Sequence, residues 1–253
     1  MSLDFFIKNH GYETAGFWLP RVTTITSIIS KPNLIQYYAR HRNIFAAQRA
    51  LALAADWGTM VHEGIENVLR GESFVIDPRI SPSVSAFRVW MREHDIEVVG
   101  EHGGIERRVT DLEHRYAGTI DIIAKVDGRV GVIDIKTGSG IWEEYYLQTA
   151  AYLHAYQEHE ENNLKDATRW ILRVDQYQEC EGCLAQRRDK DGTQHVKGGK
   201  KFCNHQWTPP KADVEWKELE GYEHDAKAFL AAKEVWEWYN KKWLQKISLY
   251  PHL

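Results

Sequence analysis

The chain has 253 residues, of which 43% are hydrophobic, 27% charged and 12% aromatic, and its formal net charge is −4. This length suits one domain, or one domain with an insertion, and the apolar fraction excludes a disordered or fibrous chain. No run approaches the ~18–20 apolar residues of a membrane helix, residues 1–4 do not resemble a secretion signal, and three cysteines do not indicate an oxidising compartment. We therefore expect a soluble protein of the cytoplasm with no membrane partner.

The apolar periodicity predicts the elements in chain order. A β-branched run covers residues 22–29. A helical stretch follows over 34–69, with a break near 57–58 and a stop at Gly71, and a second helix covers 82–93. Strands are predicted over 96–99, 104–109, 116–126 and 130–136, then a helix over 143–158, a strand over 168–175 and an aromatic-rich helix over 223–245. This order predicts one α/β domain over 1–253, with a mixed central sheet flanked by helices. Residues 178–207 fit none of these elements and are interpreted as an insertion.

Positive charge is concentrated in two segments although the total is negative. Residues 14–55 contain no carboxylate and carry five basic residues among several aromatic ones, and residues 187–201 carry six basic and two acidic residues. Basic segments with aromatic side chains suit a polyanion that also offers bases for stacking. A solvated helix face would have the same composition. The candidate DNA contacts are Arg40, Arg42, Arg187 and Arg188.

Residues 116–138 predict a β-hairpin. Two β-rich runs meet at Asp127-Gly128, a dipeptide that favours a two-residue type I′ turn. Cross-strand partners then have positions that sum to 255, which places Asp121 opposite Asp134 on one face. Lys136 lies on the face of Asp134, roughly 6–7 Å along the strand. A shift of one residue in the turn would move Asp121 to the other face.

Facing carboxylates destabilise a hairpin unless something offsets their repulsion. A divalent cation would do so, and oxygen ligands without thiolates favour Mg²⁺ or Mn²⁺. A lysine beside the pair can orient a water and stabilise charge that develops on a phosphate. The simpler alternative is a half-exposed hairpin whose polar residues face water.

Three further residues are weak signals when each is taken alone. His62 lies on the predicted helix that follows the first basic segment, where most histidines are packed or surface residues. Gln148 and Tyr152 are four residues apart and share one face of their predicted helix.

Five short motifs stand in one order along the chain: Gly58-x-x-x-His62, Glu106, Gly118-x-x-Asp121, Asp134-Ile135-Lys136-Thr137-Gly138 and Gln148-x-x-x-Tyr152. That order resembles the RecB-type branch of the PD-(D/E)XK nucleases, which includes phage-type exonucleases. The likeness extends to the run 22–25 and to the closing aromatic helix, and it covers nearly all of the chain except 178–207.

The resemblance implies a restriction-endonuclease-like core and a divalent-metal-dependent DNA nuclease, with exonuclease action expected. It also implies a role in recombination or repair, a partner protein from such a process, and a bacterial cell or phage-infected host as the setting. An endonuclease of the same chemistry stays open, as does a non-catalytic adaptor that binds nucleic acid through its basic segments. Cleavage polarity, strand preference and oligomeric state are not indicated.

The resemblance also assigns roles to residues. Asp121 and Asp134 would bind Mg²⁺ or Mn²⁺ together with His62 and the main-chain carbonyl of Ile135, and Lys136 would position the attacking water. Glu106 would support the metal site, with Glu101 and Glu113 as competing candidates. Gln148 and Tyr152 would orient the DNA backbone and the lysine.

All three cysteines lie in the segment 178–207. The pattern Cys180-x-x-Cys183 is followed by Cys203-x-His205, and the loop between the two pairs is rich in glycine and charge. Three cysteines and a histidine are an accepted tetrahedral set for structural Zn²⁺, and a loop without a core needs such a staple. The alternatives are three unrelated thiols, or His195 in place of His205. The basic residues around the cluster suggest a DNA-gripping finger.

Overall fold

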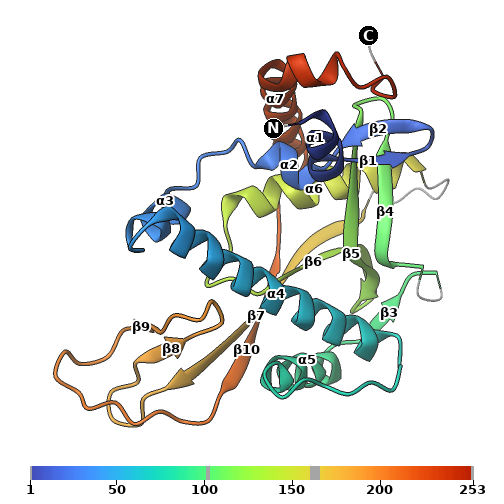
Figure 1. Ribbon diagram of the computed structural model, residues 1–253. Coiled ribbons are helices and arrows are strands. Elements are labelled where there is room, and N and C mark those ends of the chain that lie inside the picture. Colours follow the sequence, from blue (N-terminus) through green and yellow to red (C-terminus); the bar gives the residue numbers. More distant parts are fainter. Residues whose placement is uncertain (1, 101–102, 160–165, 252–253) are drawn as a thin grey trace.

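The computed structural model describes residues 2–100, 103–159 and 166–251 (Figure 1). The elements of the first half are α1 (Leu3–His10), β1 (Gly11–Thr14), β2 (Phe17–Pro20), α2 (Val22–Thr26), α3 (Pro32–Ala39), α4 (Ile44–Leu69), α5 (Ser81–Glu93), β3 (Ile96–Val98), β4 (Ile105–Asp111) and β5 (Tyr116–Val126). Those of the second half are β6 (Arg129–Lys136), α6 (Glu143–His159), β7 (Thr168–Glu179), β8 (Gln186–Arg188), β9 (His195–Lys197), β10 (Lys211–Glu218) and α7 (Tyr222–Leu244).

Eight of the described strands form one mixed sheet, and the mixed central sheet is predicted from the sequence although three of its strands, β8, β9 and β10, are not. The order is β3-β5-β6-β7-β8-β9, with β4 also paired to β5 and β10 also paired to β7. Strands β6 and β7 run parallel, because α6 connects them as a crossover, and the other pairs among the described strands of this sheet are antiparallel. The small sheet of β1 and β2, helix α1 and strand β10 are not predicted from the sequence.

The β5–β6 hairpin has the predicted register. Its turn residues Asp127 and Gly128 both have positive φ, 48° and 87°, as a type I′ turn requires. The pairs run from Val126↔Arg129 to Ile122↔Ile133, so partner positions sum to 255. The paired part of the two strands ends at Ile122↔Ile133, one position before the carboxylates Asp121 and Asp134.

The predicted break near residues 57–58 is wrong. Helix α4 is continuous there, and the chain breaks earlier, between α3 and α4, because Asn43 caps α4 by accepting a hydrogen bond from Ala46 N at 2.9 Å. Gly58 instead permits a close approach, since a Cβ on it would stand 3.1 Å from Thr137 Oγ1. The β-branched run at 22–29 begins with the short helix α2.

Helices cover both faces of the sheet and divide the core in two (Figure 1). Helices α2, α6 and α7 pack on one face around Ile123, Tyr152 and Phe229. Helices α4 and α5 pack on the other face around Ile65 and Ile133. The polar residues of the hairpin lie where α4 and α6 approach the same strands. No helix in the described part of the chain combines the length and apolar character needed to cross a bilayer.

The end of β7, with β8 and β9, extends away from this core as an arm, here defined as residues 178–207 (Figure 1). The arm also contacts the helical side of the molecule, where the Tyr37 hydroxyl of α3 donates to Asp191 Oδ2 at 2.6 Å. The same carboxyl oxygen lies 2.6 Å from His195 Nε2.

Candidate active site

The sheet and two helices bring the predicted hairpin residues together with the distant ones. Lys136 Nζ lies 2.5 Å from Asp134 Oδ2, and Gln148 Nε2 of α6 donates to Asp134 Oδ1 at 3.1 Å. Asp121 Oδ2 accepts from Ile135 N at 2.7 Å and lies 3.7 Å from His62 Nδ1 of α4. Residues from four separate elements therefore converge at the end of the β5–β6 ladder.

The position of Gln148 depends on the packing of Tyr152 against Gly118. A Cβ on Gly118 would stand 2.4 Å from the Tyr152 ring, so only a glycine in β5 lets Tyr152 pack against the strand. Gln148 Nε2 also donates to the Tyr152 hydroxyl at 2.9 Å. The four-residue spacing of Gln148 and Tyr152 therefore reflects packing that directs the Gln148 amide toward Asp134.

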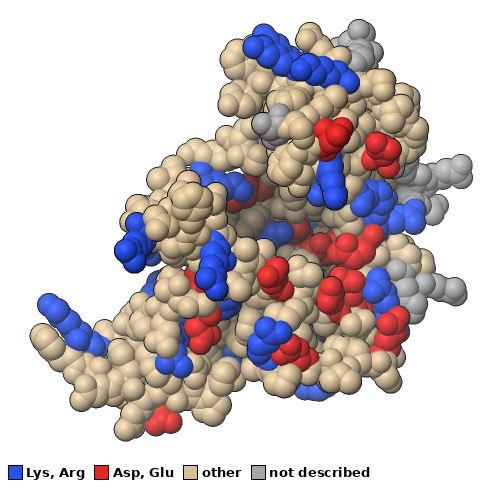
Figure 2. All heavy atoms as spheres, viewed as in Figure 1, with Lys and Arg blue, Asp and Glu red and all other residues tan. Residues whose placement is uncertain are grey.

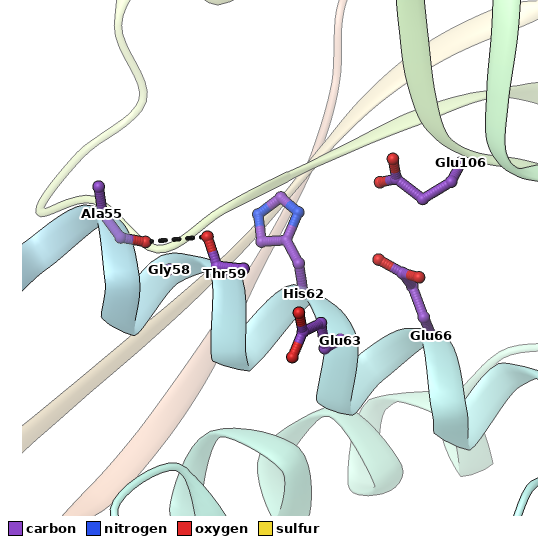
Figure 3. Close-up of a pocket in the computed structure, with 7 residues that line it drawn as sticks. All are labelled: Ala55, Gly58, Thr59, His62, Glu63, Glu66 and Glu106. Atoms are coloured by element: carbon purple, nitrogen blue, oxygen red, sulfur yellow. Dashed lines mark hydrogen bonds between the residues drawn. The ribbon is translucent and has the colours of Figure 1, made fainter.

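A pocket of 570 Å³ opens beside these residues, along one face of α4. In Figure 3, Glu66 points from α4 toward Glu106, with the His62 ring beside them. Figure 2 shows acidic side chains gathered around a hollow on this side of the molecule, with basic side chains nearby. One ligand atom from each of His62, Glu106 and Asp121 lies within 4.8 Å of the others, which is close enough to hold one metal ion. The residues that line the pocket are Ala55, Gly58, Thr59, His62, Glu63, Glu66 and Glu106.

The surroundings raise the pKa of all three carboxylates at this site, Asp121, Asp134 and Glu106. Burial raises the pKa of both Asp121 and Asp134, and Lys136 offsets this only in part. Burial and the nearby carboxylates Asp121 and Glu66 raise the pKa of Glu106 to about 7. Burial and Lys136 lower the pKa of His62 to about 4, so its ring is neutral and can serve as a ligand. A bound cation would favour the ionised form of the three carboxylates and would accept the lone pair of the neutral His62 ring.

Two neighbours of this site are missing from the sequence prediction. Glu66 follows His62 by four residues, so helical spacing could have indicated it. Tyr145 places its ring 4.7 Å from Lys136 Nζ, and no sequence spacing indicates that contact. Of the carboxylates that compete with Glu106, Glu113 is exposed in the turn between β4 and β5, and Glu101 lies outside the described residues.

The four candidate DNA-binding arginines have different surroundings. Arg40 and Arg42 are exposed between α3 and α4. Arg187 donates to Gln178 Oε1 at 3.0 Å through Nε, and its guanidinium lies 5.0 Å from the Trp207 ring centroid. Arg188 donates through Nε and Nη2 to the two oxygens of Asp175, at 2.9 and 2.6 Å. The two arm arginines therefore have structural partners of their own.

The arm gathers the three cysteines with His205 rather than His195. Each of these four residues places one ligand atom within 4.8 Å of the others. Cys180 Sγ lies 3.7 Å from Cys203 Sγ, and Cys183 Sγ lies 3.4 Å from His205 Nδ1. The three cysteines form no disulfide. A Cβ on Gly199, which has a φ of +81°, would stand 2.7 Å from Cys183 Sγ, so the backbone closes tightly over the cluster.

Comparison with known proteins identifies the family of this chain. Residues 78–242 match the family model of the PD-(D/E)XK nuclease superfamily. No curated protein shows significant sequence similarity. Among solved structures, a crystal structure of LHK-Exo in complex with dAMP is 13% identical, covers 72% of this chain and 82% of its own, and has a TM-score of 0.26.

Proposed function

The chain belongs to the PD-(D/E)XK nuclease superfamily, and on that premise we propose that it is a divalent-metal-dependent DNA exonuclease of the RecB-type branch. The observation that carries the proposal is the convergence of Asp121, Asp134, Lys136 and His62 beside one acidic pocket, because a merely solvated hairpin would not bury its carboxylates against a lysine. The exonuclease action and the branch rest on the order of the sequence motifs.

The donor set fits Mg²⁺ or Mn²⁺. Asp121, Asp134, His62 and the carbonyl of Ile135 would hold the ion, and Glu106 would complete or support its coordination. Asp134 Oδ2 is buried and, apart from its ion pair with Lys136 Nζ, has no hydrogen-bond partner among the described residues, so it can still bind a metal ion. When bound, the cation would supply the charge that activates a water and neutralises the phosphate.

The chain's own groups have distinct tasks in hydrolysis. Lys136 would donate hydrogen bonds to the attacking water and to the phosphate oxygen that gains negative charge. Gln148 fixes the Asp134 carboxylate through its amide. The exposed Arg40 and Arg42 would attract the DNA backbone toward the pocket, and Tyr152 would support the phosphate contacts through Gln148.

The proposal is tested with end-labelled linear DNA, single- and double-stranded, and with covalently closed circles, each incubated with Mg²⁺, Mn²⁺ or EDTA. We expect wild type to shorten linear DNA only with metal and to leave circles intact, and Lys136→Ala to lose cleavage while binding DNA. Lys125→Ala, an exposed lysine on β5, is the control and should cut normally.

Other outcomes of this assay would revise the proposal. Cutting of closed circles would establish an endonuclease instead. Metal-independent cutting, or normal cutting by Lys136→Ala, would overturn the proposed chemistry. DNA binding without cleavage by wild type would favour the non-catalytic adaptor.

We further propose that the arm binds structural Zn²⁺ through Cys180, Cys183, Cys203 and His205. Burial opposes ionisation of Cys180, but hydrogen bonds from His205 and Gly182 dominate and lower its pKa to about 6, which favours the thiolate that metals bind. Cys183→Ser should lose one zinc per chain in elemental analysis and make the arm sensitive to proteases. His195→Ala should keep the zinc. Equal zinc in Cys183→Ser and wild type would refute the site.

A further inference from the structure

A third cluster of ligand atoms lies away from the nuclease pocket and from the arm. Asp111 ends strand β4, His114 lies in the turn that follows, and His154 lies on α6. The three residues place one ligand atom each within 4.8 Å of one another. Asp111 Oδ2 is 3.0 Å from His114 Nδ1 and 3.5 Å from His154 Nε2.

The hydrogen bonds around His154 are all satisfied when Nδ1 carries the ring proton. The Tyr222 hydroxyl donates its single proton to Gln157 Oε1 at 3.1 Å. The same hydroxyl oxygen lies 3.1 Å from His154 Nδ1, so it accepts a hydrogen bond from a protonated Nδ1. In a neutral ring, Nε2 then carries a lone pair.

That lone pair is directed at another acceptor. His154 Nε2 is buried and, within the residues that the structure describes, has no hydrogen-bond partner. The atom it faces, Asp111 Oδ2, belongs to a carboxylate that is 1% exposed. Two buried acceptors 3.5 Å apart without a proton between them repel each other, and a cation between them would turn that repulsion into two bonds.

The surroundings hold the three ligands in place. Asp111 Oδ1 accepts from His114 N at 2.7 Å, which fixes the carboxylate. The hydrogen bond between the Tyr222 hydroxyl and His154 Nδ1 orients the imidazole, as a hydrogen bond to the second nitrogen does in metal-binding histidines. Among the described residues, no lysine or arginine forms a direct ion pair with Asp111; its close partners are the two histidines, and Lys233 acts on it only through a longer-range electrostatic interaction.

We infer that Asp111, His114 and His154 form a binding site for a divalent transition-metal ion of the zinc class. Two imidazoles and one carboxylate suit such an ion better than Mg²⁺. Because His114 and His154 side chains are 31% and 25% exposed, the ion can enter from solvent and water can complete its coordination. The site would tie the β4–β5 turn to α6, the helix that also carries Gln148 and Tyr152. This inference does not depend on the proposed nuclease activity.

The site is tested by counting zinc on the full chain after dialysis against a fixed concentration of free Zn²⁺, with Mg²⁺ in excess to occupy the acidic pocket. We expect His114→Ala and His154→Ala each to hold one zinc fewer than wild type. His224→Ala, whose side chain is 91% exposed outside any cluster, is the matched control and should retain the full number. Cys183→Ser also loses one zinc, and the double variant with His114→Ala should lose two.

A second measurement separates metal binding from folding. Added Zn²⁺ should raise the melting temperature of Cys183→Ser, and this rise should disappear when His114→Ala is combined with it. His114 lies in a partly exposed turn, so its replacement leaves the core intact even if His154→Ala unfolds the chain. Equal zinc content in wild type and His114→Ala, with an unchanged thermal response, would overturn the inference. Cleavage assayed in Mg²⁺ alone reports on the nuclease proposal independently.

Discussion

Asp175 and Asp134 are buried carboxylates on adjacent strands of one sheet, β7 and β6. Their surroundings shift the two pKa values in opposite directions. Asp175 is 4% exposed and contacts two arginines, Arg188 at 2.6 Å and Arg173 at 2.9 Å. Burial raises its pKa, but the arginines dominate and hold the pKa below its usual value. Asp134 is 1% exposed, and the single cation Lys136 does not offset burial and Asp121, so its pKa is raised.

The difference separates a structural carboxylate from one prepared for a ligand. At Asp175 the protein supplies the compensating charge, and the region is complete without any added ion. At Asp134 the negative charge of the pocket exceeds the positive charge that the protein provides. A site with this imbalance binds a cation from outside, and the predictions below test the contrast.

The largest expected effect on stability is at Asp175. Asp175→Asn leaves Arg188 and Arg173 without their buried counter-charge and should cost about 3 kcal/mol. This corresponds to a fall of roughly 6–12 °C in melting temperature for a chain of this size. Thermal unfolding at pH 7 measures it, and an unchanged melting temperature would show that Asp175 is not the structural carboxylate described here.

The pH dependence of this loss follows from the sign of the shift. Because the folded pKa of Asp175 is lowered, its stabilisation is present above the unfolded pKa and is lost as pH falls through the folded pKa. The difference between wild type and Asp175→Asn should therefore be constant from pH 5 to 8 and shrink below about pH 4. A difference that grows on acidification would contradict the assignment.

A smaller loss is expected where the pocket depends on packing. Gly118→Ala inserts a Cβ at 2.4 Å from the Tyr152 ring and should destabilise the fold by about 1–3 kcal/mol. It should also reduce cleavage, because Tyr152 and Gln148 move together. Gly138→Ala meets only ordinary contacts, the nearest at 3.7 Å, and serves as the control for stability. Equal melting temperatures for the two variants would refute the packing argument.

Gln148→Ala should affect the metal site more than the fold. Loss of the amide that holds Asp134 Oδ1 is expected to weaken metal affinity or activity by about 10–100-fold. The measurement is the Mn²⁺ concentration needed for half-maximal cleavage, with Gln245→Ala at the exposed end of α7 as the control. An unchanged Mn²⁺ requirement would remove Gln148 from the site.

The smallest effect is expected at Glu106. The pKa of Glu106, about 7, lies above the ordinary 4.5. Without metal, the ionised Glu106 therefore destabilises the fold, and this destabilisation develops as pH rises above 4.5 and is complete above pH 7. Glu106→Gln should raise the melting temperature of the metal-free protein by at most a few degrees at pH 8 and leave it unchanged at pH 4.5. A decrease at pH 8 would show that Glu106 is stabilised by its surroundings.

The sequence predicts the sheet and hairpin well because their signals are local. The Asp127-Gly128 turn predicts the register that the structure shows from Val126↔Arg129 to Ile122↔Ile133, and the apolar runs locate most strands and helices. The break before α4 depends on the Asn43 cap, which the periodicity of a helical stretch does not reveal. Strand β10 and the approach of Glu66 to Glu106 depend on tertiary packing, and no residue spacing encodes them.

The spacing of cysteines and His205 predicts a cluster that the structure brings together, since four ligands within one segment leave few arrangements. The surroundings of Arg187 and Arg188 could not be predicted, because their partners Gln178, Trp207 and Asp175 lie on other parts of the arm and on β7. Positive charge in a sequence indicates neither exposure nor availability.

The most direct test of the account is calorimetric titration of Mn²⁺ into metal-stripped wild type, Asp134→Asn and Asp175→Asn. The account predicts that wild type and Asp175→Asn bind Mn²⁺ with similar affinity, and that Asp134→Asn loses at least about 10-fold in affinity, because only Asp134 depends on an external cation. Unchanged Mn²⁺ binding by Asp134→Asn would contradict the assignment of the pocket as a metal site.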